Sequence, residues 1–319
     1  MKAVVQDRYG GPQDLRISDL PVPEPRATEI RVKIRACGVN LSDWEYLVGR
    51  PLYARLVGGI FRPKNPILGS DIVGIVDKLG SGTTRFNIGD RVMGDLVMVR
   101  GGFAEYACVS EAEMIHVPDE LSDEIAACLP QAGGIALAGT EGLTSNDTLL
   151  INGAGGGSGT MVLQIAKAAG AHVTAVDNAH KIAWLDELGA DETFNYKELD
   201  FSTSGRKWSR ILDMVATRGP LRIARCLTKN GTYHALGGNV GILLSLLAGG
   251  LIYRLVGKSI GMLIVPSGRE LMEKVAIAAV EGRISPHLEA VLPLSSVPEA
   301  LRRTGCGEVK GKLVIKPTD

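Results

Sequence analysis

A glycine-rich segment in the middle of the chain has the composition of a phosphate-binding turn. Residues 153–159 read Gly-Ala-Gly-Gly-Gly-Ser-Gly, after an apolar run at 147–152 and before a helical pattern at 158–169. Residues 171–176 then read as a second strand, so the glycines lie inside one strand–turn–helix–strand unit. Missing side chains let the backbone approach a pyrophosphate, and the helix N-terminus offers unpaired N–H groups. The pattern predicts that a dinucleotide is held by Gly153, Gly155, Gly156, Gly157 and Ser158.

Three residues beyond the turn bear on which dinucleotide is bound. Asp177 ends the second strand, where a carboxylate can bind the ribose hydroxyls of NAD and repel the 2′-phosphate of NADP. Lys181 and Tyr196 are expected near the adenosine end, and either could bind a 2′-phosphate. An exposed helix face is the plain alternative for Lys181. The sequence therefore predicts NAD or NADP and leaves the choice open.

The rest of the chain must supply the elements that position these residues. The first 120 residues carry short β-rich runs broken by Pro and Gly, spaced as in a compact barrel or sandwich. After residue 121, strands and helices alternate, which predicts a parallel, doubly wound α/β sheet. Residues 312–315 return to β character and are expected to rejoin the first domain. Further strands are expected at 210–214 and 231–236, and further helices at 179–188 and 269–281.

Composition and charge exclude several classes of protein. The 319 residues are 45% hydrophobic and 22% charged, which suits two packed domains. Lys plus Arg (35) balances Asp plus Glu (35), so no overall field favours nucleic acid or an acidic membrane. Five scattered cysteines without a CxxC pair argue against a disulfide framework and favour a reducing cytoplasm. The N-terminal residues show no export signal.

Residues 241–255 form the most apolar stretch of the chain. The stretch is interrupted by Gly249-Gly250 and is shorter than the roughly 20 apolar residues that a membrane span needs. We expect a buried or pocket-lining helix and loop, and no membrane span.

Several further segments occur in a fixed order along nearly the whole chain. They read CGVNLSD (37–43), LGSD (68–71), GDRV (89–92), GGFAEY (101–106), LGAD (188–191) and GKLVI (311–315). Together with the glycine turn, they resemble the zinc-free medium-chain dehydrogenases/reductases. This is the quinone oxidoreductase and enoyl reductase branch of the alcohol dehydrogenase superfamily.

The resemblance implies a GroES-like β-barrel domain, residues 1–122 with 267–319, enclosing a Rossmann domain at 123–266, with the active site in the cleft. It also implies a homodimer, in which residues 259–265 could pair as edge strands across a two-fold axis. Gly237 is assigned to the cofactor site in the same way. Apolar residues that could line a substrate pocket, or could simply be core, are Trp44, Tyr53, Phe61 and 243–247.

Two positions separate the chain from the zinc-dependent relatives. By the resemblance, those relatives have Cys where this chain has Asn40 and His where it has Ser70. The five histidines fall in no ligand spacing, so we predict no metal.

Without a Lewis acid, the substrate oxygen must be polarised by hydrogen-bond donors. The resemblance places Asn40 beside the nicotinamide and substrate, and its amide is the best candidate donor. Asn40 could also cap a helix that begins near Leu41. Asp43 is a weaker candidate, expected to orient backbone more than to transfer protons. The predicted reaction is hydride transfer from NADPH or NADH to an apolar quinone or conjugated carbonyl, with the proton taken from water.

Two other functions are compatible with the same residues. The first is reduction of an α,β-unsaturated carbonyl at carbon, as in enoyl and alkenal reductases. The second is a nicotinamide-binding redox sensor or interaction protein with little turnover. It is suggested by Asp177, by the apolar stretch at 241–255 and by Ile135, which cannot supply the hydroxyl that a Thr of the relatives would offer the cofactor.

Overall fold

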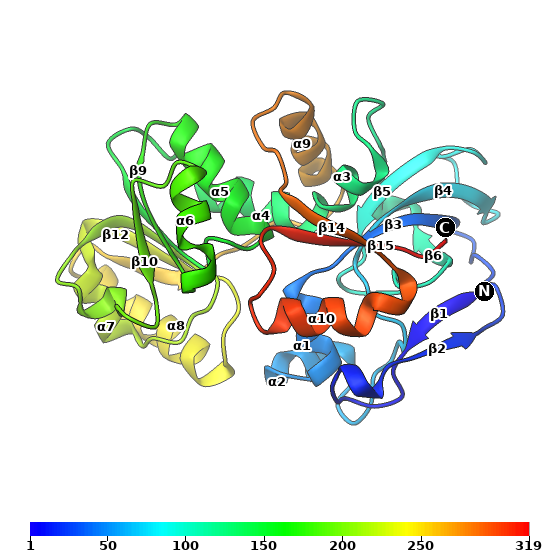
Figure 1. Cartoon of the computed structure of the whole chain (residues 1–319), viewed down its shortest axis with the longest axis horizontal. Coiled ribbons are helices and arrows are strands. Elements are labelled where there is room, and N and C mark those ends of the chain that lie inside the picture. The colour runs from blue at the N-terminus through cyan, green and yellow to red at the C-terminus, as the bar shows by residue number, and fades with distance from the viewer. Residues whose placement is uncertain (319) are drawn as a thin grey trace. The chain divides into compact units, whose positions relative to one another are not determined.

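The computed structural model describes residues 1–318 and divides into two compact units. The first unit comprises residues 1–134, 266–282 and 286 onward, and the second comprises 135–265 with 283–285 (Figure 1). The boundary at Gly134 falls inside helix α4 (Pro130–Thr140).

The second unit is built on a six-stranded sheet in which every neighbouring pair is parallel. The strand order is β10-β9-β8-β11-β12-β13, so the chain starts near the middle, winds to one edge and then to the other. This is the doubly wound order of dinucleotide-binding folds, as the alternation of elements predicts. The strands are β8 (Thr148–Asn152), β9 (His172–Asp177), β10 (Glu192–Asn195), β11 (Trp208–Asp213), β12 (Leu227–Ala235) and β13 (Ser259–Met262).

Four helices connect these strands. Helices α5 (Gly157–Ala168) and α6 (Ala179–Glu187) contact strands β8, β9 and β10, whereas α7 (Pro220–Cys226) and α8 (Val240–Arg254) pack together and against β12 and β13 (Figure 1). Strands β8 and β9 are short apolar runs with both faces covered, so their residues are almost wholly buried.

Helix α8 corrects the expectation of a helix broken by its two glycines. The helix runs unbroken through Gly249 and Gly250 because both face close neighbours. A Cβ at Gly249 would lie 2.4 Å from Pro220 Cβ, and one at Gly250 would lie 2.2 Å from the Ile260 carbonyl oxygen. The glycines therefore let the helix pack closely against Pro220 and Ile260. Among residues 1–318, no helix is long and apolar enough to cross a membrane.

The first unit contains a two-stranded sheet and a seven-stranded sheet. The larger sheet has the order β14-β15-β3-β4-β5-β7, with β6 also pairing with β3. The C-terminal strand lies in this unit, where β15 pairs antiparallel with β3. The strands are β1 (Lys2–Val5), β2 (Arg16–Asp19), β3 (Glu29–Gly38), β4 (Asp71–Leu79), β5 (Arg91–Asp95), β6 (Tyr106–Ser110), β7 (Met114–His116), β14 (Leu288–Pro293) and β15 (Lys312–Lys316).

Helices cover part of this unit and share its apolar core. Helix α1 packs against α10, which the sequence patterns do not predict. Strand β3 buries alternate residues from Ile30 onward, and all of its last three residues, Ala36 to Gly38. The helices are α1 (Leu41–Val48), α2 (Leu52–Gly58), α3 (Asp123–Ala127), α9 (Arg269–Val280) and α10 (Val297–Gly305).

Candidate active site and dinucleotide turn

The glycine turn of the second unit connects β8 to α5. Gly156 is the N-cap of the helix in an extended conformation, and Gly153 has a positive φ of 90°. At Gly156 a Cβ would meet no protein atom closer than the Gly153 carbonyl oxygen, at 3.7 Å. At Gly159 a Cβ would lie 2.5 and 2.6 Å from two backbone carbonyl oxygens of the turn. Gly159 thus closes the turn against the helix, while Gly156 leaves space beside the helix N-terminus.

The carboxylate of Asp177 hydrogen-bonds to the backbone of this turn. Its Oδ2 accepts a hydrogen bond from Gly155 N (2.8 Å), and its Oδ1 accepts one from Asn178 N (2.8 Å). Lys181 Nζ lies 3.6 Å from Oδ1, and both side chains are buried. The alternative of an exposed helix face is wrong for Lys181, which is 3% exposed and covers Gly155 with its aliphatic part.

Tyr196 and Gly237, also assigned to the cofactor, follow two strands that are separated in the sheet by β9, β8 and β11. Tyr196 follows β10, with its backbone N bonded to the Asp177 carbonyl and its side chain about half exposed. Gly237 follows β12 with a φ of 80°. The turn, Asp177 and Lys181 are therefore in direct contact, while Tyr196 joins them through its backbone.

Asn40 lies in the first unit, between β3 and α1, and is almost fully buried. Its amide nitrogen Nδ2 donates to Ser70 Oγ (3.0 Å), and its amide oxygen Oδ1 accepts from Lys312 Nζ (2.6 Å). Ser70 precedes β4 and Lys312 begins β15, so three separate strands bring these groups together. The side chain of Asn40 therefore bonds to residues beside two other strands, in addition to preceding helix α1.

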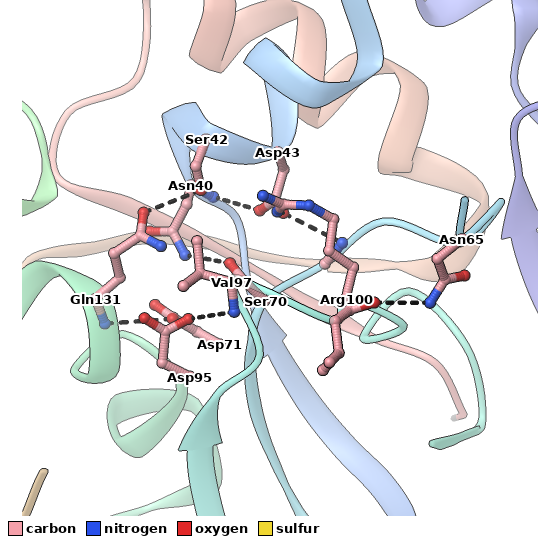
Figure 2. A network of polar contacts seen from close by, with 12 residues as sticks. Asn40, Ser42, Asp43, Asn65, Ser70, Asp71, Asp95, Val97, Arg100 and Gln131 are labelled. Atoms are coloured by element: carbon pink, nitrogen blue, oxygen red, sulfur yellow. Dashed lines mark hydrogen bonds and ion pairs between the residues drawn. The ribbon is translucent and has the colours of Figure 1, made fainter. Parts of the chain in front are cut away.

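Two carboxylates lie beside this cluster. Asp71 Oδ2 is 3.3 Å from Lys312 Nζ, and Oδ1 accepts from Gln131 N (3.2 Å). Asp95 stands opposite Asp71 in the β4–β5 pairing, and Figure 2 shows the two carboxylates close together. Burial raises the pKa of Asp71, although the Lys312 charge opposes the rise. Burial, with the charge of Asp71, raises the pKa of Asp95 to about 7.

Asp43, the second predicted site residue, serves the backbone around Asn40. Its Oδ2 accepts from Asn40 N (2.9 Å), and its Oδ1 accepts from Gly69 N (3.2 Å) and from an Nη of Arg100 (3.3 Å; Figure 2). Complete burial raises the pKa of Asp43 to about 6, although the Arg100 charge acts in the opposite direction. The carboxylate fixes the loops that carry Asn40 and Ser70.

Comparison with known proteins places these two units in one family. Residues 26–119 match the family described as "Alcohol dehydrogenase GroES-like domain", and residues 188–315 match "Zinc-binding dehydrogenase". The chain is 33% identical to a quinone oxidoreductase of Pseudomonas aeruginosa over 67% of this chain and 70% of that protein. The chain belongs to the quinone oxidoreductase family of medium-chain dehydrogenases/reductases.

Two further relatives extend the match over the full length. A chloroplast envelope quinone oxidoreductase homolog of Arabidopsis thaliana is 29% identical, covering 99% of this chain and 98% of that protein. The solved quinone oxidoreductase of Coxiella burnetii has a TM-score of 0.86 and 27% identity, covering 100% and 99% of the two chains. The predicted GroES-like and Rossmann folds are confirmed, and the chain is an oxidoreductase of this family.

The Asn40 cluster has no donor set suited to zinc, although one matching family is described as zinc-binding. Zinc in proteins takes thiolate, imidazole or carboxylate ligands. This cluster offers an amide, a hydroxyl and an ammonium, and the ammonium of Lys312 already donates to the amide oxygen. Within residues 1–318 no three His, Cys, Asp or Glu side chains are grouped to hold a metal.

The candidate pocket residues lie in different surroundings. Trp44 and Tyr53 pack partly buried against the core of the first unit, and Tyr53 OH donates to Glu45 Oε2 (3.0 Å). Phe61 is 93% exposed. On α8, Leu243 and Leu246 are buried, whereas Leu244 and Leu247 are exposed.

Sequence reasoning missed Lys312 as a site residue. The segment GKLVI carries part of the family resemblance, and it also contains one signal for a partnered lysine. A lysine directly before the apolar residues of a strand is a candidate for a partnered charge, because a buried charge needs a partner, but Lys316 at the other end of the strand offers the same signal.

Proposed function

We propose that the chain reduces an apolar quinone or conjugated carbonyl, with the Asn40 amide donating a hydrogen bond to the substrate oxygen. The observation that carries the proposal is the buried Asn40 amide, whose Nδ2 donates to Ser70 Oγ and lies beside the Asp71 carboxylate. An amide nitrogen carries two N–H bonds, so the second can meet an oxygen that gains negative charge.

The chain's residues divide the task between binding and polarisation. When bound, the reduced nicotinamide supplies the hydride. The glycine turn and the N-terminus of α5 bind the pyrophosphate through backbone N–H groups. The Asn40 amide stabilises the oxyanion, and water supplies the proton that completes the hydroxyl group. Removing one such donor from an oxyanion hole costs roughly 10²- to 10³-fold in kcat.

We further propose that the choice between NADH and NADPH depends on the Asp177–Lys181 pair. The Asp177 carboxylate already accepts two backbone hydrogen bonds and faces the Lys181 ammonium. Its charge is therefore compensated inside the protein. Lys181 is required for a 2′-phosphate to be tolerated near Asp177.

The test begins with binding titrations of NADH and NADPH, followed by a panel of benzoquinones, naphthoquinones and enals. Asn40→Ala should lose kcat by at least tenfold while the Kd of the cofactor changes less than twofold. Unchanged turnover would remove Asn40 from the mechanism. Hydroquinone as the product supports reduction at oxygen, and a saturated carbonyl by mass spectrometry supports reduction at carbon. Tight cofactor binding with no oxidation across the panel supports the sensor.

Assembly as a homodimer is proposed through strand β13, which forms one edge of the parallel sheet. An edge strand presents unpaired N–H and C=O groups to a second copy. Light scattering on the purified chain should give twice the 33.8 kDa mass, and a monomer across the accessible concentrations would refute this assembly.

A further inference from the structure

The geometry points to Lys312 as the residue that positions and polarises the Asn40 amide for oxyanion binding. This inference rests on the proposed function and deepens it. Lys312 is 3% exposed, and its ammonium lies closer to Asn40 Oδ1 (2.6 Å) than to Asp71 Oδ2 (3.3 Å).

The first argument concerns the orientation of the amide. Ser70 cannot decide which end of the amide faces it, because a hydroxyl both donates and accepts. An ammonium only donates, so the group that meets Lys312 must be the amide oxygen. Asn40 Nδ2 is thereby turned toward Ser70, and the neighbouring Asp71 carboxylate, which can only accept, favours the same orientation. Without the ammonium, the amide could rotate and present its oxygen, an acceptor, to an oxygen of the substrate.

The second argument concerns charge. A cation at the amide oxygen draws electron density from the nitrogen, so the N–H groups become better donors, and burial strengthens the effect. The resemblance places metal ligands of the zinc-dependent relatives at Asn40 and Ser70. In this chain the ammonium of Lys312, on β15, supplies a positive charge at the same place. It acts on the substrate through the Asn40 amide and not by direct contact.

A purely structural ion pair with Asp71 is the competing explanation for Lys312. In that case Lys312 would stabilise the first unit regardless of whether Asn40 is present. In a positioning role, Lys312 matters only through the amide that it orients. The two explanations therefore predict different results in a chain that already lacks the amide.

The experiment is a double-mutant cycle on kcat with Lys312→Met, Asn40→Ala and the combined variant, each with cofactor Kd and unfolding midpoint. Lys312→Met should lower kcat roughly 10- to 100-fold, the loss typical of residues that hydrogen-bond a metal ligand without touching the metal. The Kd of the cofactor should change less than twofold. In the Asn40→Ala background the same change should lower kcat less than twofold further. If Lys312→Met fails to fold, Lys312→Met/Asp71→Asn takes its place, because it leaves no uncompensated carboxylate.

The matched control is Lys316→Met, the same substitution at the other end of β15, where Lys316 pairs at the surface with Glu124. The kcat of Lys316→Met should equal that of the unaltered chain. An equal loss of kcat in Lys316→Met would show that any lysine substitution in β15 lowers turnover, and would refute the positioning role. Unchanged kcat in Lys312→Met, or losses that multiply in the combined variant, would also overturn it. An unaltered chain that turns over no quinone, enone or enal would instead overturn the proposed function, and this inference with it.

Discussion

Gly156→Ala separates cofactor binding from folding at the glycine turn. The new Cβ would find no protein atom within 3.7 Å, and the φ of −89° is open to any residue. The changed N-cap preference and the reduced freedom of the unfolded chain act in opposite directions, so the free energy of unfolding should change by less than about 1 kcal/mol. A pyrophosphate against the turn would meet the added methyl group. The Kd for both NADH and NADPH should therefore rise at least about tenfold, or about 1.4 kcal/mol.

Two glycines of the same unit provide the comparisons. Gly219 is also a helix N-cap with negative φ, and a Cβ there meets nothing within 4 Å, so Gly219→Ala should likewise change the free energy of unfolding by less than about 1 kcal/mol and leave cofactor binding unchanged. Gly159→Ala should destabilise the chain by about 1–3 kcal/mol even without cofactor, because its Cβ meets two backbone oxygens. Binding is measured by nucleotide fluorescence and stability by urea unfolding. Gly156→Ala that binds both nucleotides as tightly as the unaltered chain would refute the pyrophosphate role of the turn.

Three further predictions concern buried charges. Lys181→Met leaves Asp177 uncompensated, so the Kd ratio of NADPH to NADH should rise about tenfold in titrations; an unchanged ratio would exclude the pair from cofactor choice. With a folded pKa of about 7 for Asp95, the folded chain retains between pH 4 and 7 a proton that the unfolded chain releases. Stability should therefore fall as pH rises through that window, and Asp95→Asn should remove a slope of about 1 kcal/mol per pH unit, measured by urea unfolding at several pH values; an equal slope in both chains would contradict this. Tyr233→Phe removes the 3.0 Å hydrogen bond to buried Asp213 and should cost about 1–2 kcal/mol in thermal unfolding, whereas an unchanged Tm would show that the bond contributes nothing.

The fold of the second unit could be predicted because its signals are local. Strands β8 and β9 are short apolar runs, helices α5 and α6 follow them within a few residues, and the glycine turn marks where β8 meets α5. The continuity of α8 could not be predicted, because Gly249 and Gly250 weaken a helix by themselves. Their close neighbours, Pro220 and Ile260, are distant in sequence.

In the candidate site, too, local sequence signals could be predicted and contacts between distant residues could not. Asn40 and Asp43 could be identified from their segment, whereas the partners that set their orientation come from loops and strands far along the chain. The surroundings of Asp177 were equally hidden: its position at a strand end suggests an open carboxylate, but the turn folds back onto it. A motif indicates which residues gather, and only the packed structure shows which atoms they use.

The contact between Asn40 and Lys312 joins residues 272 positions apart. At roughly 5 to 20 residues per second of synthesis, Asn40 waits about 15 to 55 s for the strand that orients it. All of residues 135–265, the main segment of the second unit, are made during that interval. The dinucleotide-binding unit can therefore fold while the amide is still unoriented, and we expect nascent chains lacking β15 to bind nucleotide without reducing substrate.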